Sequence, residues 1–153
     1  MSAPPRFLPT KDMTMTVKLA SLKANLEREA AGDWIEYPDW PGVAFCVKSL
    51  HSPSYITARD LMLQRQARKN KGKAPPADVI AVEAGKIYSQ HILLGWRGLD
   101  VEYSADVALQ VLTDPAYRQV VAAIEWCAQQ VAQTDIEFVE EATKNSDRPS
   151  AGV

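Results

Sequence analysis

Two histidines, His51 and His91, are the side chains best suited to acid–base or metal chemistry near neutral pH. His51 lies directly before Ser52, but no G-x-S-x-G sequence surrounds this serine, so the pattern of a hydrolase nucleophile is missing. His91 falls on the apolar face of a predicted helix, where a histidine usually packs within the core. An enzyme built around either histidine is therefore the weakest of three functional hypotheses.

The cysteines and the C-terminal glutamates add no catalytic pattern. Cys46 and Cys127 lie far apart without zinc-type spacing, and we expect two buried free thiols. Glu140 and Glu141 are adjacent, so on a helix their side chains point to different sides. No H-E-x-x-H motif, P-loop or dinucleotide-binding fingerprint is present. The sequence predicts no catalytic residue, no metal site and no cofactor.

The composition is typical of a soluble globular protein. The chain has 153 residues, of which 46% are hydrophobic and 24% charged. Seventeen basic residues stand against nineteen acidic ones, and this net charge of -2 predicts no nucleic-acid partner. No apolar run reaches the roughly 20 residues of a membrane span, and the N-terminus lacks the apolar core of a signal peptide. We expect a cytoplasmic protein without membrane contact.

The element that organises the chain is an apolar stretch, Val79–Asp100, which reads as one long helix. Its apolar residues recur at alternating spacings of four and three and therefore share one face. Gly95 or Gly98 can end this helix because glycine tolerates the left-handed conformation of a C-terminal cap. We interpret this helix as the central support of the fold.

Residues 33–49 predict a small β-hairpin. Both arms are rich in aromatic and β-branched residues, and a Pro-Asp-Trp-Pro-Gly turn at 38–42 separates them. Alternation along the second arm places Val43, Phe45 and Val47 on one face. An isolated hairpin is marginally stable in water, so this one must pack on helices or on a partner.

Further helices are predicted from caps and periodicity. One begins at the Thr16 cap and ends at Gly32, and a second runs from Pro53 to Lys69 and ends in a basic stretch. We interpret that stretch as a solvated helix end, because no aromatic residues interleave it. Ser104 caps a short helix, and a final helix opens at Asp114-Pro115 and runs to about Glu141, with Phe138 in its buried stripe. The two helices after Ser104 could mimic a helix-turn-helix. The second carries only one arginine, together with a glutamate, near its start, and this is a poor set of residues for reading a DNA groove.

These elements predict a mainly α (α+β) fold, with four to five helices and the small N-terminal hairpin. Residues 1–15 are expected to form a flexible arm, residues 16–143 a single helical domain, and residues 144–153 a flexible tail.

Trp126 departs from the apolar stripe of the last helix, because it lies about 200° around the helix from Ile124. Two readings remain open. Either Trp126 is an exposed anchor for another protein, or another helix or the hairpin covers it. An anchor replaced by alanine would weaken partner binding and leave the thermal melt nearly unchanged.

The order of several short motifs resembles a known family. Glu29–Ile35 (EAAGDWI) precedes the hairpin, Trp96–Asp100 (WRGLD) ends the apolar stretch, and Tyr103–Pro115 (YSADVALQVLTDP) follows. Phe138–Glu141 and Lys144-Asn145 complete the pattern. It is similar to the tail assembly chaperones of long-tailed, non-contractile bacteriophages and their prophage remnants. One departure is the short Asp100–Tyr103 connection, where such proteins often carry an extra Asp-Gly turn.

The resemblance implies a non-enzymatic protein that binds and solubilises the tape measure protein while the tail tube polymerises. It also implies recruitment of the tail tube protein, in many relatives through a longer frameshifted form. The protein would act in the host cytoplasm and be absent from the mature virion, and the sequence leaves homo-oligomerisation open. The candidate client-binding residues are Trp34, Trp40, Trp96, Trp126 and Gln129.

The main alternative is a structural part of the virion, such as a head–tail connector or a tail terminator. Connectors form closed rings, so the oligomeric state separates the two hypotheses.

Overall fold

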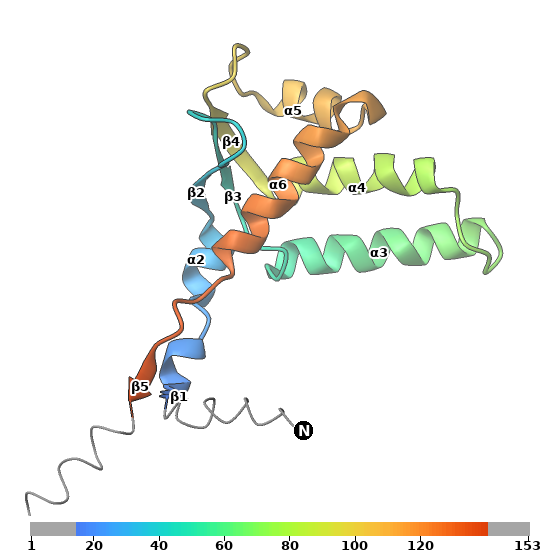
Figure 1. Cartoon of the computed structure of the whole chain (residues 1–153). Helices are drawn as coiled ribbons and strands as arrows, with labels where there is room; N and C mark the ends of the chain where they lie inside the picture. The colour runs from blue at the N-terminus through green and yellow to red at the C-terminus, as the bar shows by residue number, and fades with distance from the viewer. Residues whose placement is uncertain (1–14, 141–153) are drawn as a thin grey trace, which may run out of the picture. The chain divides into compact units, whose positions relative to one another are not determined.

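A computed structural model describes residues 15–140, which divide between two compact units. The larger unit, residues 25–133, contains five α-helices and a three-stranded sheet, and it confirms the predicted mixed α+β class (Figure 1). Its elements are α2 (Leu26–Ala31), β2 (Asp33–Glu36), β3 (Ala44–Val47), α3 (Pro53–Lys69), α4 (Ala77–His91), β4 (Leu93–Arg97), α5 (Ala105–Leu112), the 3-10 helix η3 (Pro115–Tyr117) and α6 (Arg118–Val131). Within residues 15–140, no helix has the length and hydropathy needed to cross a membrane.

The predicted hairpin is confirmed, and the sheet adds a third strand to it. Strand β3 pairs antiparallel with both β2 and β4. Phe45 and Val47 of β3 are fully buried, because α6 crosses this face of the sheet (Figure 1). The Cys127 thiol of α6 lies 3.8 Å from the Ile35 carbonyl oxygen of β2. The sheet and α6 therefore form the centre of the core.

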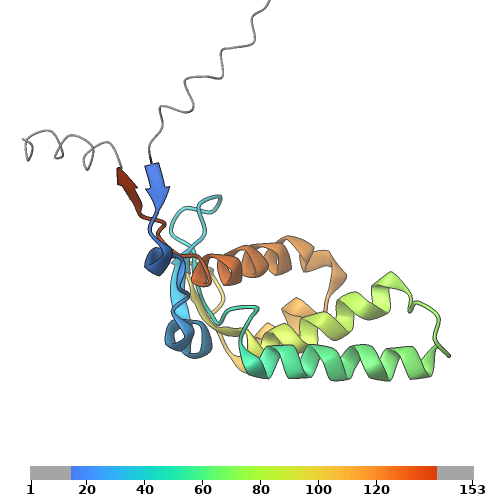
Figure 2. The ribbon, with the colours of Figure 1, turned by 90° about the horizontal axis from the view of Figure 1, so that it is seen from below.

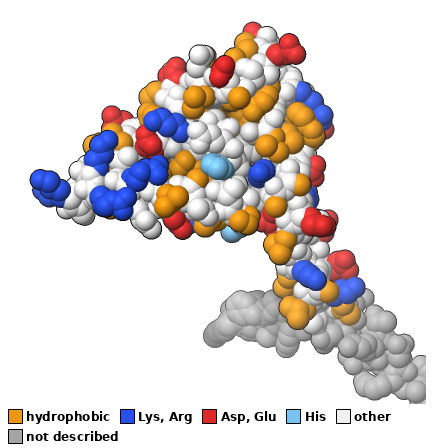
Figure 3. Space-filling view, turned by 180° about the vertical axis from the view of Figure 1, so that it is seen from behind, with side chains coloured by type: hydrophobic (Ala, Val, Ile, Leu, Met, Phe, Trp, Pro, Cys, Tyr) orange, Lys and Arg blue, Asp and Glu red, His pale blue; other side chains and the backbone are white. Residues whose placement is uncertain are grey.

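Helices α3 and α4 form an antiparallel pair that extends away from the sheet (Figures 1 and 2). The predicted bounds of α3, Pro53–Lys69, are confirmed. Tyr55 and Met62 of its predicted apolar side are buried, whereas Leu63 is exposed. Lys and Arg side chains gather over the free end of the pair, as predicted for a solvated basic end (Figure 3).

The prediction of one helix over Val79–Asp100 is wrong. Helix α4 ends at His91, and the apolar continuation forms β4 instead. The backbone of β3 has an open edge, and Lys48 N–H donates to the Ile92 carbonyl at the point where the chain turns into the sheet. Pairing with β3 satisfies these backbone groups and buries Leu93, so the tertiary context overrides the helical periodicity.

The predicted helix from Thr16 to Gly32 is also wrong. Asn25 caps α2 by accepting a hydrogen bond from the Arg28 amide at 3.1 Å, so the helical segment starts only at Leu26. Short helices are marginal without a buried face, and Leu26 is 73% exposed. Met15–Val17 forms the strand β1 and Leu19–Leu22 the 3-10 helix η2.

The last predicted helix is ten residues too long. Helix α6 ends at Val131, and Phe138–Glu140 forms β5, which pairs antiparallel with β1 in the smaller unit. Phe138, predicted to be buried, is 56% exposed. The predicted arm and tail lie outside the described residues, apart from Met15.

The caps predicted at Ser104 and Asp114 are confirmed. Ser104 Oγ accepts from the Val107 amide at 3.2 Å, and Asp114 Oδ1 accepts from the Ala116 amide at 2.9 Å. Ser52 holds the N-cap position of α3, but its buried hydroxyl makes no capping bond. These caps fix where α5 and η3 begin, and therefore the shape of the surface between them.

Candidate protein-binding site

An open groove lies between the loop after β4, helix α5 and the start of α6. It has a volume of about 490 Å³ and a mostly apolar lining. Two of its lining residues, Val101 and Tyr117, are 50% and 47% exposed. Further apolar lining residues are Trp96, Leu99, Val107, Val111 and Val120. The groove is therefore an accessible surface with a mainly apolar lining.

Trp96 holds the loop after β4, which forms one wall of the groove. Its ring is buried, and Nε1 donates to the Val101 carbonyl oxygen at 2.8 Å. Tyr103 packs edge-on against the same ring, with a centroid distance of 5.3 Å. Gly98 adopts a φ of +92°, and an added Cβ there would lie 2.2 Å from the Gly42 carbonyl oxygen. The close approach to the hairpin turn thus requires glycine and fixes the path of the loop.

Tyr117 stands between this groove and a second hollow of about 360 Å³. The second hollow is lined by Trp40 of the hairpin turn and by residues 115–120. Tyr117 belongs to η3, whose start is set by the Asp114 cap and by Pro115 at its first position. One short 3-10 turn therefore presents an aromatic side chain to both hollows.

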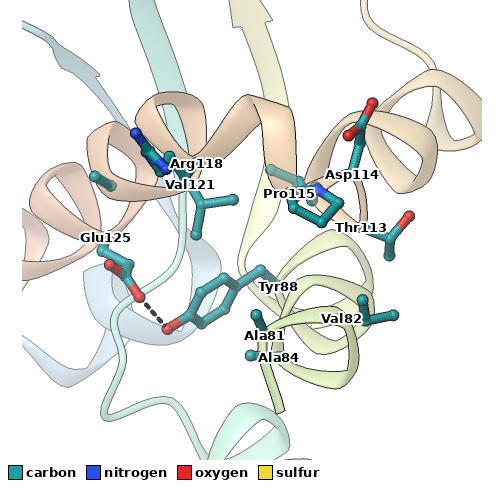
Figure 4. A pocket seen from close by; sticks show the side chains of 12 residues that line it. Ala81, Val82, Ala84, Tyr88, Thr113, Asp114, Pro115, Arg118, Val121 and Glu125 are labelled. Atoms are coloured by element: carbon teal, nitrogen blue, oxygen red, sulfur yellow. Dashed lines mark hydrogen bonds between the residues drawn. The ribbon is translucent and has the colours of Figure 1, made fainter. Parts of the chain in front are cut away.

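A third hollow of about 220 Å³ lies between α4 and α6, next to the same turn (Figure 4). Tyr88 points into it and donates a 2.6 Å hydrogen bond from its hydroxyl to Glu125 Oε2. Burial of the ring, together with the Glu125 carboxylate, raises the pKa of Tyr88 well above its usual value. Arg118, the first residue of α6, also lines the hollow.

Replacement of Tyr88 by phenylalanine is expected to lower the free energy of unfolding by about 1–2 kcal/mol near neutral pH, because Glu125 loses its donor. The unfolded state releases the phenolic proton at about pH 10, whereas the folded state keeps it. The stabilisation is therefore present below about pH 10 and is lost as the pH rises above it. Urea unfolding across an alkaline pH series measures this, and the variant should show the shallower decline. Equal slopes in both proteins would contradict the assignment.

The structure brings Trp40 and Trp126 together around Tyr37. The Tyr37 ring packs edge-on against Trp40 at 4.8 Å and against Trp126 at 5.6 Å. Tyr37 of the hairpin thus covers part of Trp126, which is half-buried and packs against the core. Sequence reasoning did not select Tyr37, although its place at the end of the first hairpin arm was visible. Its contact with α6 depends on a long-range packing that no local pattern encodes.

The other candidates lie apart from this cluster. Trp34 is 42% exposed on the sheet face opposite α6, with the Arg97 guanidinium 4.6 Å from its ring centroid. Gln129 is exposed near the end of α6 and lines a separate hollow with His51. Of the five predicted residues, Trp96 lines the groove, Trp40 lines the adjoining hollow, and the others line neither.

The groups with catalytic potential are dispersed. His51 and His91 line different hollows, and residues 15–140 contain no cluster of three or more potential metal-binding side chains. Cys127 is buried and Cys46 half-buried, and both are free thiols. Burial raises the pKa of Cys127 to about 11, so at neutral pH it is an unreactive thiol.

Comparison with known proteins places the chain. A family described as "YdaY prophage protein" matches residues 50–145, a span that includes α3 to α6 and every residue of the groove. No curated protein matches the chain. No solved structure matches it either. Because the family match covers more than half of its length, the chain belongs to the YdaY prophage protein family and is of bacteriophage origin.

Proposed function

We propose that this protein is a phage tail assembly chaperone that binds and solubilises the tape measure protein. The observation that carries the proposal is the position of the two motif segments. Trp96–Asp100 and Tyr103–Pro115, which resemble segments of such chaperones, supply most of the lining of one apolar groove. Membership of a prophage protein family is consistent with a phage tail assembly role.

The groove suits an amphipathic helix. A helix laid in an apolar groove inserts side chains at positions i, i+3 or i+4, and i+7. Tyr117 and Val101 are exposed lining residues of the groove, so they can contact such a helix. A tape measure protein is a long helical chain whose apolar surface aggregates unless it is covered. Many weakly bound copies along one client gain from multivalency.

The proposal includes a non-enzymatic role in the host cytoplasm and absence from the mature virion. It also includes recruitment of the tail tube protein, directly or through a longer frameshifted form. The groove contains no paired nucleophile and base among its described residues, so its chemistry favours holding a polypeptide over transforming a small molecule.

Replacement of Val101 by aspartate together with Tyr117 by alanine is expected to weaken client binding at least about tenfold, because both are exposed apolar residues of the groove. The measurement is the soluble fraction of a co-expressed tape measure protein from the same prophage. The matched control is Leu109→Asp, since Leu109 is a similarly exposed residue of α5 that does not line the groove.

Equal loss of client solubility in the groove and control variants would argue against the groove. Recovery of the protein in purified virions would instead support a connector or terminator.

A further inference from the structure

The turn between α3 and α4 carries a concentrated positive charge. Five cations and no carboxylate occur from position 65 to position 73, and all five are exposed: Arg65, Arg68, Lys69, Lys71 and Lys73. The first three lie in the last turns of α3, at spacings of three and four, so they share one side of the helix. Figure 3 shows Lys and Arg side chains, in blue, gathered at the free end of the helix pair. We call these five residues the basic tip.

The basic tip is an ordered turn. Gly72 N–H donates to the Ala67 carbonyl at 2.8 Å, and Asn70 Nδ2 donates to the Gln66 carbonyl at 2.7 Å. Lys71 has a φ of 53°, and it is the one non-glycine residue with positive φ within the described part of the chain. Glycine is the residue that normally occupies this position after a helix. A lysine here therefore keeps a charge where the backbone favours a residue without a side chain.

The cations of the basic tip have no partner within residues 15–140. The four ion pairs there use Lys18, Arg28, Arg59 and Lys86. The same chain carries the complementary feature at another place. Positions 98–117 contain four acidic residues and no basic one.

Three of these carboxylates form what we term the acidic loop: Asp100, Glu102 and Asp106, all exposed and without an ion pair in the described chain. They lie in the connection between β4 and α5 and in the first turn of α5. Figure 1 shows this connection at the end of the larger unit remote from the α3–α4 turn. The two oppositely charged surfaces lie apart and form no ion pair with each other within one copy of the larger unit.

We infer that the basic tip of one copy binds the acidic loop of a second copy, so that copies associate head to tail. Because the two surfaces differ, each copy offers one of each, and the contact repeats without closing on itself unless the rotation forms a ring. The inference concerns the protein alone and does not rest on the proposed client, although Asp100 of the acidic loop also lines the groove. Linked copies would nevertheless suit a long linear client, through multivalency.

A second copy fits the charges better than nucleic acid does. The chain has seventeen basic and nineteen acidic residues, so outside the tip twelve cations face nineteen anions. A long polyanion bound at the tip would also be repelled by this excess of negative charge. A small acidic loop can contact the tip alone. No aromatic residue occurs from position 64 to position 76 to stack on bases.

The test is sedimentation equilibrium of the full chain at ionic strengths from about 0.01 M to about 1 M, over which the screening length falls from about 30 Å to about 3 Å. The wild-type protein should associate at low salt and be monomeric at high salt. A tip variant, Arg65→Glu with Lys69→Glu, and a loop variant, Glu102→Lys with Asp106→Lys, should each lose at least about tenfold in association constant. An equimolar mixture of the two should recover association, because the reversed charges are again complementary.

Two further variants make the result specific. Lys23→Glu with Lys86→Glu changes the net charge by the same amount away from the tip and should leave association within about twofold of wild type. Lys71→Gly should raise the melting temperature, because the positive φ no longer strains a side chain, and yet weaken association about two- to threefold. Neither loop charge reversal touches the groove lining, so client binding can be scored separately.

A wild-type protein that stays monomeric at low salt would overturn the inference. So would an equimolar mixture that fails to recover association. Salt-sensitive binding of duplex DNA or anionic vesicles by a monomeric protein, lost in the tip variant, would assign the basic tip to that other partner.

Discussion

Replacement of Gly85 by alanine is expected to lower the free energy of unfolding by about 3 kcal/mol or more. Gly85 is buried in α4, and an added Cβ would lie 2.0 Å from the carbonyl oxygen of Leu112 and 2.7 Å from its carbonyl carbon. These are backbone atoms of α5, so relief requires the two helices to separate. Because small domains are stable by only about 5–15 kcal/mol, this change removes a large share of the total.

The sign of this effect opposes helix propensity. In an unconstrained helix interior, alanine is more favourable than glycine by about 1 kcal/mol. The matched control is Ala81→Gly, an exposed position one turn earlier in α4, where a loss of about 1 kcal/mol is expected. Urea unfolding followed by circular dichroism measures both variants. A Gly85→Ala protein as stable as wild type would show that α4 and α5 do not approach as closely as described.

Replacement of Trp126 by alanine is expected to lower the free energy of unfolding by about 2–3 kcal/mol. Removal of the half-buried ring leaves a gap beside Tyr37 and the core. The loss should be smaller than for a fully buried tryptophan, since Trp126 is only half-buried. Below the melting temperature, client solubilisation should persist, because Trp126 does not line the groove. Thermal melts and the co-expression assay provide the two readouts.

Gln129→Ala is the matched control for this prediction, since Gln129 lies one turn further along α6 and is exposed. Its effect on stability should stay within about 0.5 kcal/mol. If Trp126→Ala leaves the melt unchanged and abolishes client solubilisation, Trp126 is an anchor for the client, as one of the two sequence-based readings held.

The two expected results concern positions that sequence inspection treats very differently. Gly85 is an isolated glycine inside an apolar helix, and nothing in its neighbourhood of the sequence predicts a contact with the end of α5. Trp126 stood out because it breaks the apolar stripe, but the stripe alone left its surroundings open. In each case the deciding atoms belong to another element, either Leu112 or Tyr37.

Local chemistry was sufficient for the caps at Ser104 and Asp114, for the hairpin turn and for the fold class, but not for the caps predicted at Thr16 and Ser52. Ser104 and Asp114 start helical segments because their side chains accept backbone hydrogen bonds two or three residues away. The hairpin was predictable because its turn residues fix dihedral angles locally and its arms favour extended backbone. Such features depend only on neighbouring residues, so the order of residues along the chain carries them.

Tertiary structure determined which conformation was adopted by apolar segments that are compatible with both helix and strand. Leu93–Arg97 has helical periodicity, and it became a strand because β3 offers unpaired backbone groups beside it. That change turned a supposed helix end into one wall of a groove, with Trp96 held by Val101 and Tyr103. A groove needs walls from distant parts of the chain, and their meeting is set by burial and backbone pairing, which no spacing along a single segment records.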